Sequence, residues 1–379
     1  MSRILVLGGS GEMASVAVAD LIAHTDHEVT IGDIRPEAAK RLLRSLGAPE
    51  RVLYVDVDDP ASLAAALRET DLVLNATLMR HNVLVTDAAI AAGVHMVDLG
   101  SYYADTLEQL TRHEAAERAG CRIVPGCGVA PGLTNVIARL GADELDAVES
   151  VRMYSYITHP MWTSPGIVVT RFDASSGTSV VYEDGEIVER PSFGDEEHIV
   201  FPEPYGEQEV HLVPHPEAIT LPRYIDVENV VFKVGYTEDE NARIRVLLEL
   251  GFDREQPFEL DGVSISPRRF TSAYVGSRGI AADARSANVK RVWVDGVRAS
   301  EPVSLVYDFA VEETGRSASS RITGTVAAIA ADLVAQDAPV GVVPPEAAFA
   351  PRVFLAELAQ RGLEVRESEV ARSTVEVSR

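Results

Sequence analysis

Side chains that can move a proton follow short apolar runs in the first third of the chain. Four of them stand out by position: His81, Asp98, Tyr102 and Tyr103. The apolar runs read as parallel strands, and the carboxyl ends of such strands meet at one edge of a sheet. We therefore predict that these side chains lie together, with the histidine or a tyrosine as general acid or base. The alternative is that Asp98 only caps a helix and that the tyrosines are half-buried packing residues.

A second group of candidates lies in the middle of the chain: His159, Arg171, His211 and His215. We predict that they contact the substrate, because a guanidinium can hold a carboxylate through two parallel hydrogen bonds. His215 precedes Pro216, so the alternative for this residue is a turn position. Ammonium groups for general-base or Schiff-base chemistry are scarce, since the chain has only three lysines. These are Lys40, Lys233 and Lys290.

The elements that position the first group alternate between β-rich runs and segments of helical periodicity, up to about residue 140. Six runs are candidate strands: Ile4–Leu7, Val29–Ile31, Val52–Val55, Leu72–Leu74, His95–Leu99 and Ile123–Val124. The segments between them read as helices, and Asp59 and Pro60 suit the cap and first turn of one. This alternation predicts βαβ units and a parallel α/β sheet of the Rossmann type.

A glycine-rich turn follows the first predicted strand and opens the first predicted helix. Its sequence, Gly8-Gly9-Ser10-Gly11-Glu12-Met13-Ala14, has the spacing Gly-x-x-Gly-x-x-Ala. Gly8 allows a tight turn, and Gly11 lets a pyrophosphate approach the free amides at a helix N-terminus. We therefore predict a dinucleotide site, although any tight strand-to-helix connection can use glycine. The residues assigned to it here are Gly8, Ser10, Gly11, Glu12 and Met13.

An acidic residue at the end of the second predicted strand fits the same site. Asp33 follows Gly11 by about 20 residues, the offset of a carboxylate that binds the adenosine ribose hydroxyls. A carboxylate there would repel a 2′-phosphate, which favours NAD, while Arg35 could stack on adenine or accommodate NADP. The alternative is that Asp33 only caps the following helix. We predict NAD as the cofactor, with NADP as the second choice.

Two further strand ends are assigned to the cofactor. Asp56, after the third strand, could meet the adenine amino group or simply cap a helix. The fourth strand ends in Asn75, Ala76 and Thr77, a small polar turn at the sheet edge where ligands bind. We therefore predict that these residues line the cofactor cleft.

Composition and charge exclude several classes of protein. The chain has 379 residues, 46% of them hydrophobic, which suits a large core and more than one domain. Its net charge of −24 repels nucleic acid and anionic membranes, so we expect neither as a partner. Cys121 and Cys127 lack zinc or redox spacing, and no metal is expected. With no signal-peptide pattern and no membrane-length apolar segment, we expect a soluble, cytoplasmic protein that acts on a small molecule.

The pattern changes after the first domain, which we place at residues 1–147. Residues 148–318 hold Val-, Tyr- and Phe-rich stretches between Pro, Gly and acidic turns, and we expect an α+β domain with a mixed or antiparallel sheet. Residues 319–379 carry amphipathic helices that we expect to dock back on the first domain. Helical segments beyond residue 147 are predicted at Arg243–Leu250, Pro267–Ala284, Thr325–Ala335 and Val353–Leu358.

Several motifs together resemble the saccharopine dehydrogenase-like oxidoreductases, and among these most of all the L-lysine 6-dehydrogenases. The likeness covers the glycine turn, Asp33, Val55-Asp56, Leu74-Asn75-Ala76 with Asn82, the stretch from Ala92 to Gly100, and Gly128-Val129-Ala130-Pro131-Gly132-Leu133-Thr134-Asn135. In this family the last of these turns begins a helix beside the nicotinamide, which implies cofactor contacts for Gly128, Pro131 and Asn135. The resemblance also implies a Rossmann domain with an inserted α+β domain for substrate binding and homodimer formation.

The activity that the resemblance implies is hydride transfer between a nicotinamide and a carbon that bears nitrogen, on an amino acid or a polyamine. Two alternatives stay open. Met79–His81 and Ser101–Ala104 differ from the lysine enzymes' segments, which leaves a reductase of C=O or C=C bonds. A Rossmann protein can also lose catalysis and act as a non-catalytic NAD-binding sensor. Polar groups that converge on the nicotinamide would favour an enzyme.

Overall fold

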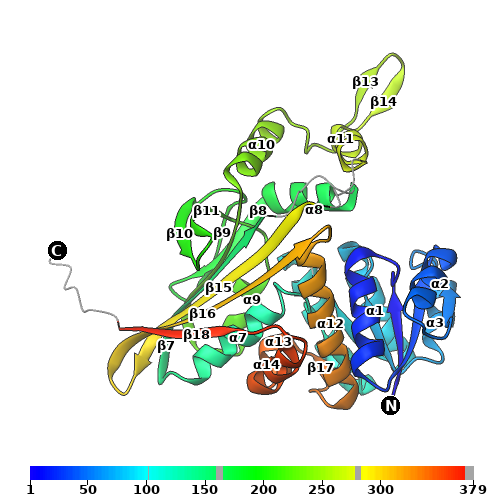
Figure 1. Ribbon diagram of the computed structural model, residues 1–379, viewed down its shortest axis with the longest axis horizontal. Helices are drawn as coiled ribbons and strands as arrows, with labels where there is room; N and C mark the ends of the chain where they lie inside the picture. Colours follow the sequence, from blue (N-terminus) through cyan, green and yellow to red (C-terminus); the bar gives the residue numbers. More distant parts are fainter. Residues whose placement is uncertain (101, 159–164, 278–282, 372–379) are drawn as a thin grey trace.

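The computed structural model describes residues 1–100, 102–158, 165–277 and 283–371. It contains two large β-sheets with helices packed around them (Figure 1). His159, one of the predicted substrate contacts, lies outside the described residues.

The first sheet is parallel and has seven strands in the order β17-β6-β5-β4-β1-β2-β3. The strands are β1 (Arg3–Leu7), β2 (Glu28–Asp33), β3 (Val52–Tyr54), β4 (Leu72–Asn75), β5 (His95–Asp98), β6 (Arg122–Val124) and β17 (Gly341–Val342). All six predicted strands are present, and the predicted Rossmann sheet is confirmed. The sequence did not reveal β17, because two residues are too few for a periodic pattern.

Helices cover both faces of this sheet. They are α1 (Glu12–His24), α2 (Pro36–Ser45), α3 (Pro60–Leu67), η1 (Met79–His81), α4 (Asn82–Ala92), α5 (Tyr103–Leu110), α6 (His113–Ala119) and α7 (Leu133–Asp143). The helix predicted after Asp59 starts as expected, since this side chain accepts a hydrogen bond from the Ala61 N–H at 3.0 Å.

The second sheet is mixed, as predicted, and has nine strands. They are β7 (Ala147–Ile157), β8 (Thr178–Glu183), β9 (Glu186–Pro191), β10 (Glu197–Phe201), β11 (Gly206–Leu212), β12 (Val227–Tyr236), β15 (Arg285–Arg298), β16 (Glu301–Thr314) and β18 (Arg366–Ala371). The order of the main path is β10-β11-β12-β7-β15-β16-β18, and β8 pairs with both β12 and β9. Only the central β12 and β7 run parallel; the other neighbours are antiparallel.

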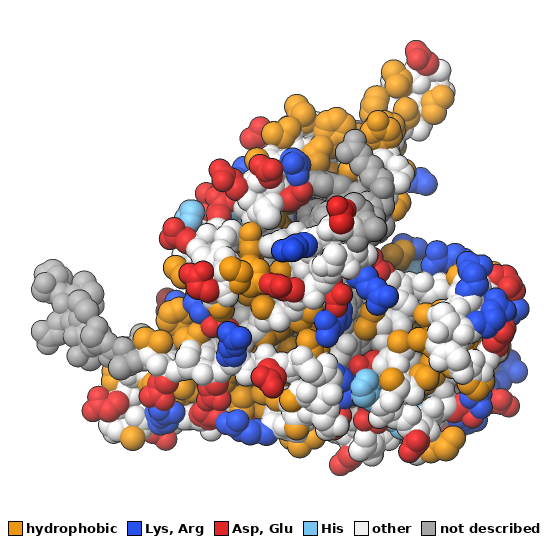
Figure 2. Space-filling view, in the orientation of Figure 1, with side chains coloured by type: hydrophobic (Ala, Val, Ile, Leu, Met, Phe, Trp, Pro, Cys, Tyr) orange, Lys and Arg blue, Asp and Glu red, His pale blue; other side chains and the backbone are white. Residues whose placement is uncertain are grey.

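The helices of this region are α8 (Pro165–Ser175), α9 (Glu217–Thr220), η2 (Leu221–Arg223), α10 (Glu238–Glu249) and α11 (Pro267–Gly276). A separate hairpin of β13 (Phe258–Leu260) and β14 (Val263–Ile265) forms an arm that projects at the top of Figure 1. Hydrophobic side chains cover much of this arm in Figure 2, and Phe258, Leu260 and Val263 are about half exposed. The expected α+β architecture of the middle region is therefore present.

The C-terminal segment returns to the first sheet and then leaves it again. It forms α12 (Ala318–Gln336), α13 (Pro345–Ala348) and α14 (Pro351–Gln360) as well as β17 and β18. Helix α12 lies beside α1, and α14 packs on α7 and α12 (Figure 1). The return of the helices was expected from the sequence. Strand β18 was not expected, and it pairs along β16 of the second sheet.

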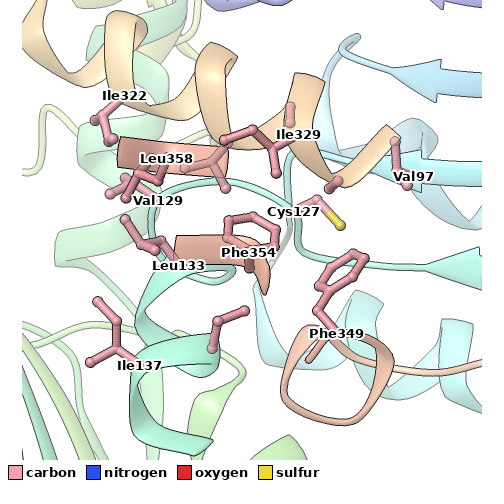
Figure 3. Packing of buried hydrophobic residues seen from close by; sticks show 14 of the residues in the cluster. Val97, Cys127, Val129, Leu133, Ile137, Ile322, Ile329, Phe349, Phe354 and Leu358 are labelled. Atoms are coloured by element: carbon pink, nitrogen blue, oxygen red, sulfur yellow. The ribbon is translucent and has the colours of Figure 1, made fainter. Parts of the chain in front are cut away.

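Apolar side chains from all three parts of the chain share one core. Figure 3 shows Ile322 and Ile329 of α12 close to Leu358 of α14. Phe349 and Phe354 contact each other below them, with ring centroids 5.2 Å apart. This common core fixes α7, which begins the connection to the second sheet.

In the part of the chain described, no helix combines the length and apolar character needed to cross a membrane.

Close packing of α12 on α1 depends on Gly324, and replacing this residue tests it. A Cβ at Gly324 would lie 2.4 Å from the Met13 carbonyl oxygen and 2.6 Å from the Val16 Cβ, so the two helices would have to separate. We expect Gly324→Ala to lower the free energy of unfolding by about 1–3 kcal/mol in a urea titration. Gly166→Ala is the matched control, because its Cβ would meet no atom of a described residue within 4 Å. Equal urea midpoints for the two variants would contradict this packing.

Candidate active site

The glycine turn ends β1 and opens α1 as the sequence predicted. Gly8 has a φ of +71°, and a Cβ there would lie 3.1 Å from the Ala76 carbonyl oxygen. The Gly11 N–H donates to the Gly8 oxygen at 2.8 Å, which closes the turn. Glu12 and Met13 begin α1, where first-turn amides have no partner within the helix. These residues leave backbone free to meet a diphosphate, so they fit a dinucleotide.

Asp33 ties the end of β2 to this turn. One carboxylate oxygen accepts hydrogen bonds from the Ser10 N–H at 3.0 Å and the Ser10 hydroxyl at 2.6 Å. The other accepts from the Arg35 N–H at 2.8 Å. The N-cap of α2 is Arg35, with no side-chain cap, so Asp33 is not the plain helix cap that the sequence left open. The Arg35 side chain is mostly exposed and reaches the Ser10 hydroxyl at 3.3 Å.

The strand end after β4 is built from a network of amides. The Asn75 Nδ2 donates to Asn82 Oδ1 at 2.8 Å, and Asn82 Nδ2 donates to the Gly100 carbonyl at 3.1 Å. The Thr77 hydroxyl donates to Asn75 Oδ1 at 2.7 Å. The network joins the carboxyl ends of β4 and β5, and the Ala76 carbonyl of the same turn faces Gly8.

Asp56 and His81 meet the loop between β3 and α3. Asp56 accepts from the Asp58 N–H at 3.0 Å, while Asp59 supplies the cap of α3. His81 is buried, with Nδ1 3.2 Å from the Thr77 hydroxyl and Nε2 3.2 Å from Asp58. Burial lowers the pKa of this imidazole. Both side chains therefore face the β3 side of the sheet.

The predicted catalytic role of Asp98 needs a correction, because the carboxylate is enclosed in the protein and does not face a substrate site. The side chain is completely buried and accepts from the Gly100 and Gly126 N–H groups, both at 2.8 Å. Its second oxygen accepts from Gln109 Nε2 at 2.8 Å, and burial raises the pKa of the carboxyl. Asp98 does not cap the next helix either, since the N-cap of α5 is Tyr102. It holds two glycine turns together.

The second glycine turn leads into α7, with Asn135 on its first turn as expected. The Pro131 ring fits against Gly100, where a Cβ would come within 2.8 Å of it, and a Cβ at Gly128 would meet the Leu99 carbonyl at 2.6 Å. The Asn135 Oδ1 accepts from the Gly132 N–H at 2.9 Å. Both of these turns thus converge on the carboxyl end of β5.

The Asn135 amide also reaches across to two other segments. Its Nδ2 lies 3.0 Å from Glu346 Oε2 of α13 and 3.4 Å from the Thr220 hydroxyl of α9. All of these groups are buried, and burial raises the pKa of Glu346 to about 7. The predicted cofactor contact is thus also the point at which the two domains and the C-terminal segment meet.

We call this meeting point of Asn135, Thr220 and Glu346 the seam. One face of the second sheet turns toward it. Lys290 of β15 lies opposite Ser155 of β7, which lies opposite Val234 of β12. Residues opposite each other in a sheet share a face, as do residues two apart in a strand. Phe232 and Tyr236 therefore lie on the same face as Lys290.

Arg171 of α8 lies over this face. Its guanidinium is 3.6 Å from the centroid of the Tyr236 ring, and burial lowers its pKa to about 9. The Tyr102 hydroxyl donates to the Thr170 carbonyl of the same helix at 3.1 Å, so the start of α5 touches α8. Burial raises the pKa of this phenol. The structure thus brings the predicted Tyr102 and Arg171 together.

His215 lies on the same face, and the backbone of Tyr103 contacts the residue before it, Pro214. The imidazole stacks on the Phe232 ring with centroids 4.2 Å apart and planes 5° apart. Its Nδ1 is 3.3 Å from the Glu217 carboxylate. The Tyr103 N–H donates to the Pro214 carbonyl at 3.1 Å, which joins α5 to this segment.

His211, the remaining substrate candidate, lies opposite Val234 on the same sheet face, but it is enclosed in a cluster of its own. It is fully buried, stacks on Phe193 at 4.2 Å and lies 2.8 Å from Glu209. Arg245 of α10 shares the same carboxylate. The predicted substrate contact of His211 is therefore corrected, because Phe193 covers the imidazole ring.

Sequence reasoning missed three buried charged residues at the seam: Glu217, Lys290 and Glu346. Lys290 donates to the Ser155 hydroxyl and, at 2.6 Å, to Asn288 Oδ1, and burial lowers its pKa to about 7. Asn288 and Lys290 alternate with apolar residues along β15. This alternation was the one sequence pattern that could have indicated a polar face on the strand. Among the described residues, no group of three or more His, Cys, Asp or Glu side chains is arranged to hold a metal.

Two family models together match nearly the whole chain. The model described as "Saccharopine dehydrogenase NADP binding domain" matches residues 4–124, and "Saccharopine dehydrogenase C-terminal domain" matches residues 128–363. Among curated relatives, a carboxyaminopropylagmatine dehydrogenase of Synechocystis is 22% identical, with 96% of each chain covered. An NADP-dependent, L-glutamate-forming saccharopine dehydrogenase of Pyricularia oryzae is 23% identical; the alignment covers 68% of this chain and 60% of that one.

Two solved structures share the fold over the whole chain. The L-glutamate-forming saccharopine dehydrogenase of Saccharomyces cerevisiae superposes with a TM-score of 0.75 at 16% identity, covering 98% of this chain and 100% of that one. A homospermidine synthase of Legionella pneumophila gives a TM-score of 0.70 at 11% identity, covering 100% and 93%. The chain therefore belongs to the saccharopine dehydrogenase family, whose members are NAD(P)-dependent oxidoreductases that act on the carbon–nitrogen bonds of amino acids or polyamines.

Proposed function

We propose that this protein interconverts an amine and an imine by hydride transfer, on a substrate that carries a carboxylate and an extended amine chain. The observation that carries the proposal is the convergence of ionisable groups at the seam. Arg171 and Lys290 are buried and His215 is part-buried, and all three lie on or over the sheet face that turns toward the first domain. A sensor that only bound NAD would not need such a set of buried charges, each of which is unfavourable to desolvate.

Arg171 is the group that we assign to the substrate carboxylate. A guanidinium can hold a carboxylate through two parallel hydrogen bonds in its plane, and the Tyr236 ring lies against its face. Tyr102 closes the same region from the side of the first domain. A carboxylate there would bridge α8 and the start of α5.

The spacing along β12 supports an extended substrate. Arg171 stacks on Tyr236 and His215 stacks on Phe232, four residues earlier on the same face. At about 3.3 Å per residue the two anchor points are roughly 13 Å apart. Names among the relatives, such as carboxyaminopropylagmatine dehydrogenase and homospermidine synthase, agree with a polyamine-like chain. Lysine, suggested by the sequence resemblance, is the shortest substrate in this class that we propose.

The chain's own residues have defined tasks in this reaction. When bound, the nicotinamide accepts a hydride from the carbon that bears nitrogen. The glycine turn and α1 would hold the diphosphate, Asp33 the adenosine ribose, and the turns at Gly100 and Gly128 would border the nicotinamide. Asp98 and Asn135 fix those two turns, and we regard both as positioning residues.

We also propose a cytoplasmic homodimer. The two thiols, Cys121 and Cys127, are free and buried, which suits a reducing compartment. The half-exposed apolar side chains of the β13–β14 arm are a surface that self-association would cover.

Turnover on a substrate panel tests the proposed function. We expect NAD(P)H formation, followed by its absorbance, with carboxylated polyamines, saccharopine-like adducts or lysine, and none with alcohols. Arg171→Gln should raise KM for carboxylated amines by about tenfold or more, since a charge-assisted hydrogen bond contributes roughly 1.5–3 kcal/mol. Its KM for an amine without a carboxylate should not change. Turnover on carbonyl compounds alone, or on nothing, would refute the amine proposal.

Cofactor binding depends on Asp33 in this proposal. Asp33→Asn removes the charge that would accept the ribose hydroxyls, so the calorimetric Kd for NAD should rise by about tenfold or more. The Kd for NADP should change less, because the carboxylate also repels the 2′-phosphate. Arg35→Ala is the matched control and should weaken NADP more than NAD. The assignment fails if Asp33→Asn binds NAD as tightly as the unmodified protein.

Glu346 makes stability depend on pH near neutrality. Its pKa is about 7 in the folded protein against 4.5 for a free side chain, so the folded state holds an extra proton between these values. The free energy of unfolding should therefore fall as pH rises from about 4.5 to 7, by up to about 3 kcal/mol, and then level off. Glu346→Gln should remove that slope in urea titrations. Glu114→Gln, at an exposed site, should keep it.

A further inference from the structure

We propose that His215 is the general acid–base residue of this enzyme, and that Glu217 and Lys290 behind it are positioning residues that set its proton affinity. The inference rests on the amine–imine function proposed above, which leaves the proton transfer unassigned. It is carried by a line of three ionisable groups that runs from the seam into the second sheet.

His215 is held so that one edge of its ring remains available. Phe232 covers one face of the imidazole, and Glu217 faces Nδ1. About a fifth of the side chain is exposed (18%), whereas Glu217 is completely buried. The hydrogen bond of Nδ1 to a carboxylate fixes the tautomer with Nε2 as the acceptor. Nε2 is then the nitrogen that meets a substrate at the seam.

Glu217 is the first residue of α9, and its carboxylate faces Nδ1 of His215. Its Oε2 is buried and makes no hydrogen bond with a described residue. A buried carboxylate is stable only beside cationic or donor groups. The ionisable groups around it are His215 in its own segment, Lys290 from β15 and Glu346 from α13. Lys290, fixed by Ser155 and Asn288, carries a positive charge on the sheet side of Glu217 below its lowered pKa of about 7.

The other proton-moving candidates are poorly placed for this role. The Tyr102 hydroxyl is bonded to the Thr170 carbonyl, and burial raises its pKa further from neutrality. His81 faces Asp58 on the β3 side of the first sheet. Asp98 has both oxygens occupied and is fully buried. His215 is the candidate whose ring lies at the seam beside the second sheet.

The reaction balances with His215 as the proton acceptor and the oxidised nicotinamide of the proposed function as the hydride acceptor. Neutral His215 takes one proton from the substrate ammonium at Nε2, which frees the nitrogen lone pair. The carbon–hydrogen bond then breaks with its electron pair leaving as hydride, which the oxidised nicotinamide would accept, and the lone pair forms the C=N bond of an iminium. In the reverse direction the protonated imidazole of His215 returns the proton to the amine nitrogen. Glu217 stabilises the imidazolium in both directions, as a carboxylate behind a catalytic histidine does.

The first test replaces the histidine itself. His215→Asn should lower kcat for amine oxidation by about a hundredfold or more, within the range of general-base catalysis, and leave the calorimetric Kd for NAD(P) unchanged. His198→Asn, at an exposed position on β10, is the control and should keep full activity. If His215→Asn is folded and turns over at more than about a third of the original rate, the proposal is overturned, because general-base catalysis contributes far more than that.

The second test separates positioning from mere structural support. Glu217→Gln removes the negative charge beside the imidazolium, so the acidic limb of kcat/KM should move to lower pH. Loss of the ammonium in Lys290→Met should move the limb the other way, by a smaller amount. Glu209→Gln, which removes the same kind of carboxylate beside His211, should leave the limb in place.

NMR titration of the His215 imidazole in the substrate-free protein gives the same shifts without an activity assay. Opposite displacements in Glu217→Gln and Lys290→Met support the relay, and no displacement in either folded variant rejects it. If the unmodified protein oxidises no amine, the function itself fails. If it oxidises amines and His215→Asn does so equally well, only this inference fails.

Discussion

The side-chain amide of Asn135 holds together three segments that are far apart in the chain. It accepts from the Gly132 N–H in the turn before α7 and donates to Glu346 of the C-terminal segment and toward Thr220 of the second domain. All of these groups are shielded from water, so an unmet donor or acceptor there would cost about 1–3 kcal/mol. The amide therefore fixes where the second sheet stands against the strand ends of the first, and every distance at the seam depends on that placement.

The dinucleotide half of the molecule was predictable because its rules are local. Alternating strands and helices, the turn at Gly8 and the offset of Asp33 all follow from backbone geometry within one βαβ unit. The structure adds that Asp33 binds Ser10, so the acidic residue and the glycine turn form one unit. Nothing in the sequence alone indicated that contact, because the hydroxyl of Ser10 had no assigned partner.

The substrate half was less predictable, because its chemistry depends on long-range pairing. Asp98 was predicted to be catalytic from its place at the end of β5, yet two turns enclose it completely. Lys290 was noticed only as one of few lysines, and its role emerges from the register that sets it opposite Ser155. His211 and His215 have similar local sequences, each with a glutamate two residues away. Only the fold shows that one is covered by Phe193 and the other lies at the seam.

Strand β17 carries a consequence for how the chain is made. It pairs with β6, but the ribosome delivers it only after strands β7 to β16 of the second sheet have been synthesised. Until then the nascent nucleotide-binding lobe exposes the backbone edge of β6, and such an open edge favours aggregation that cells usually counter with chaperones. Long-range parallel pairing is also slow to form. The first lobe to be translated is thus among the last to be finished, and its completion requires that the downstream part has already been synthesised.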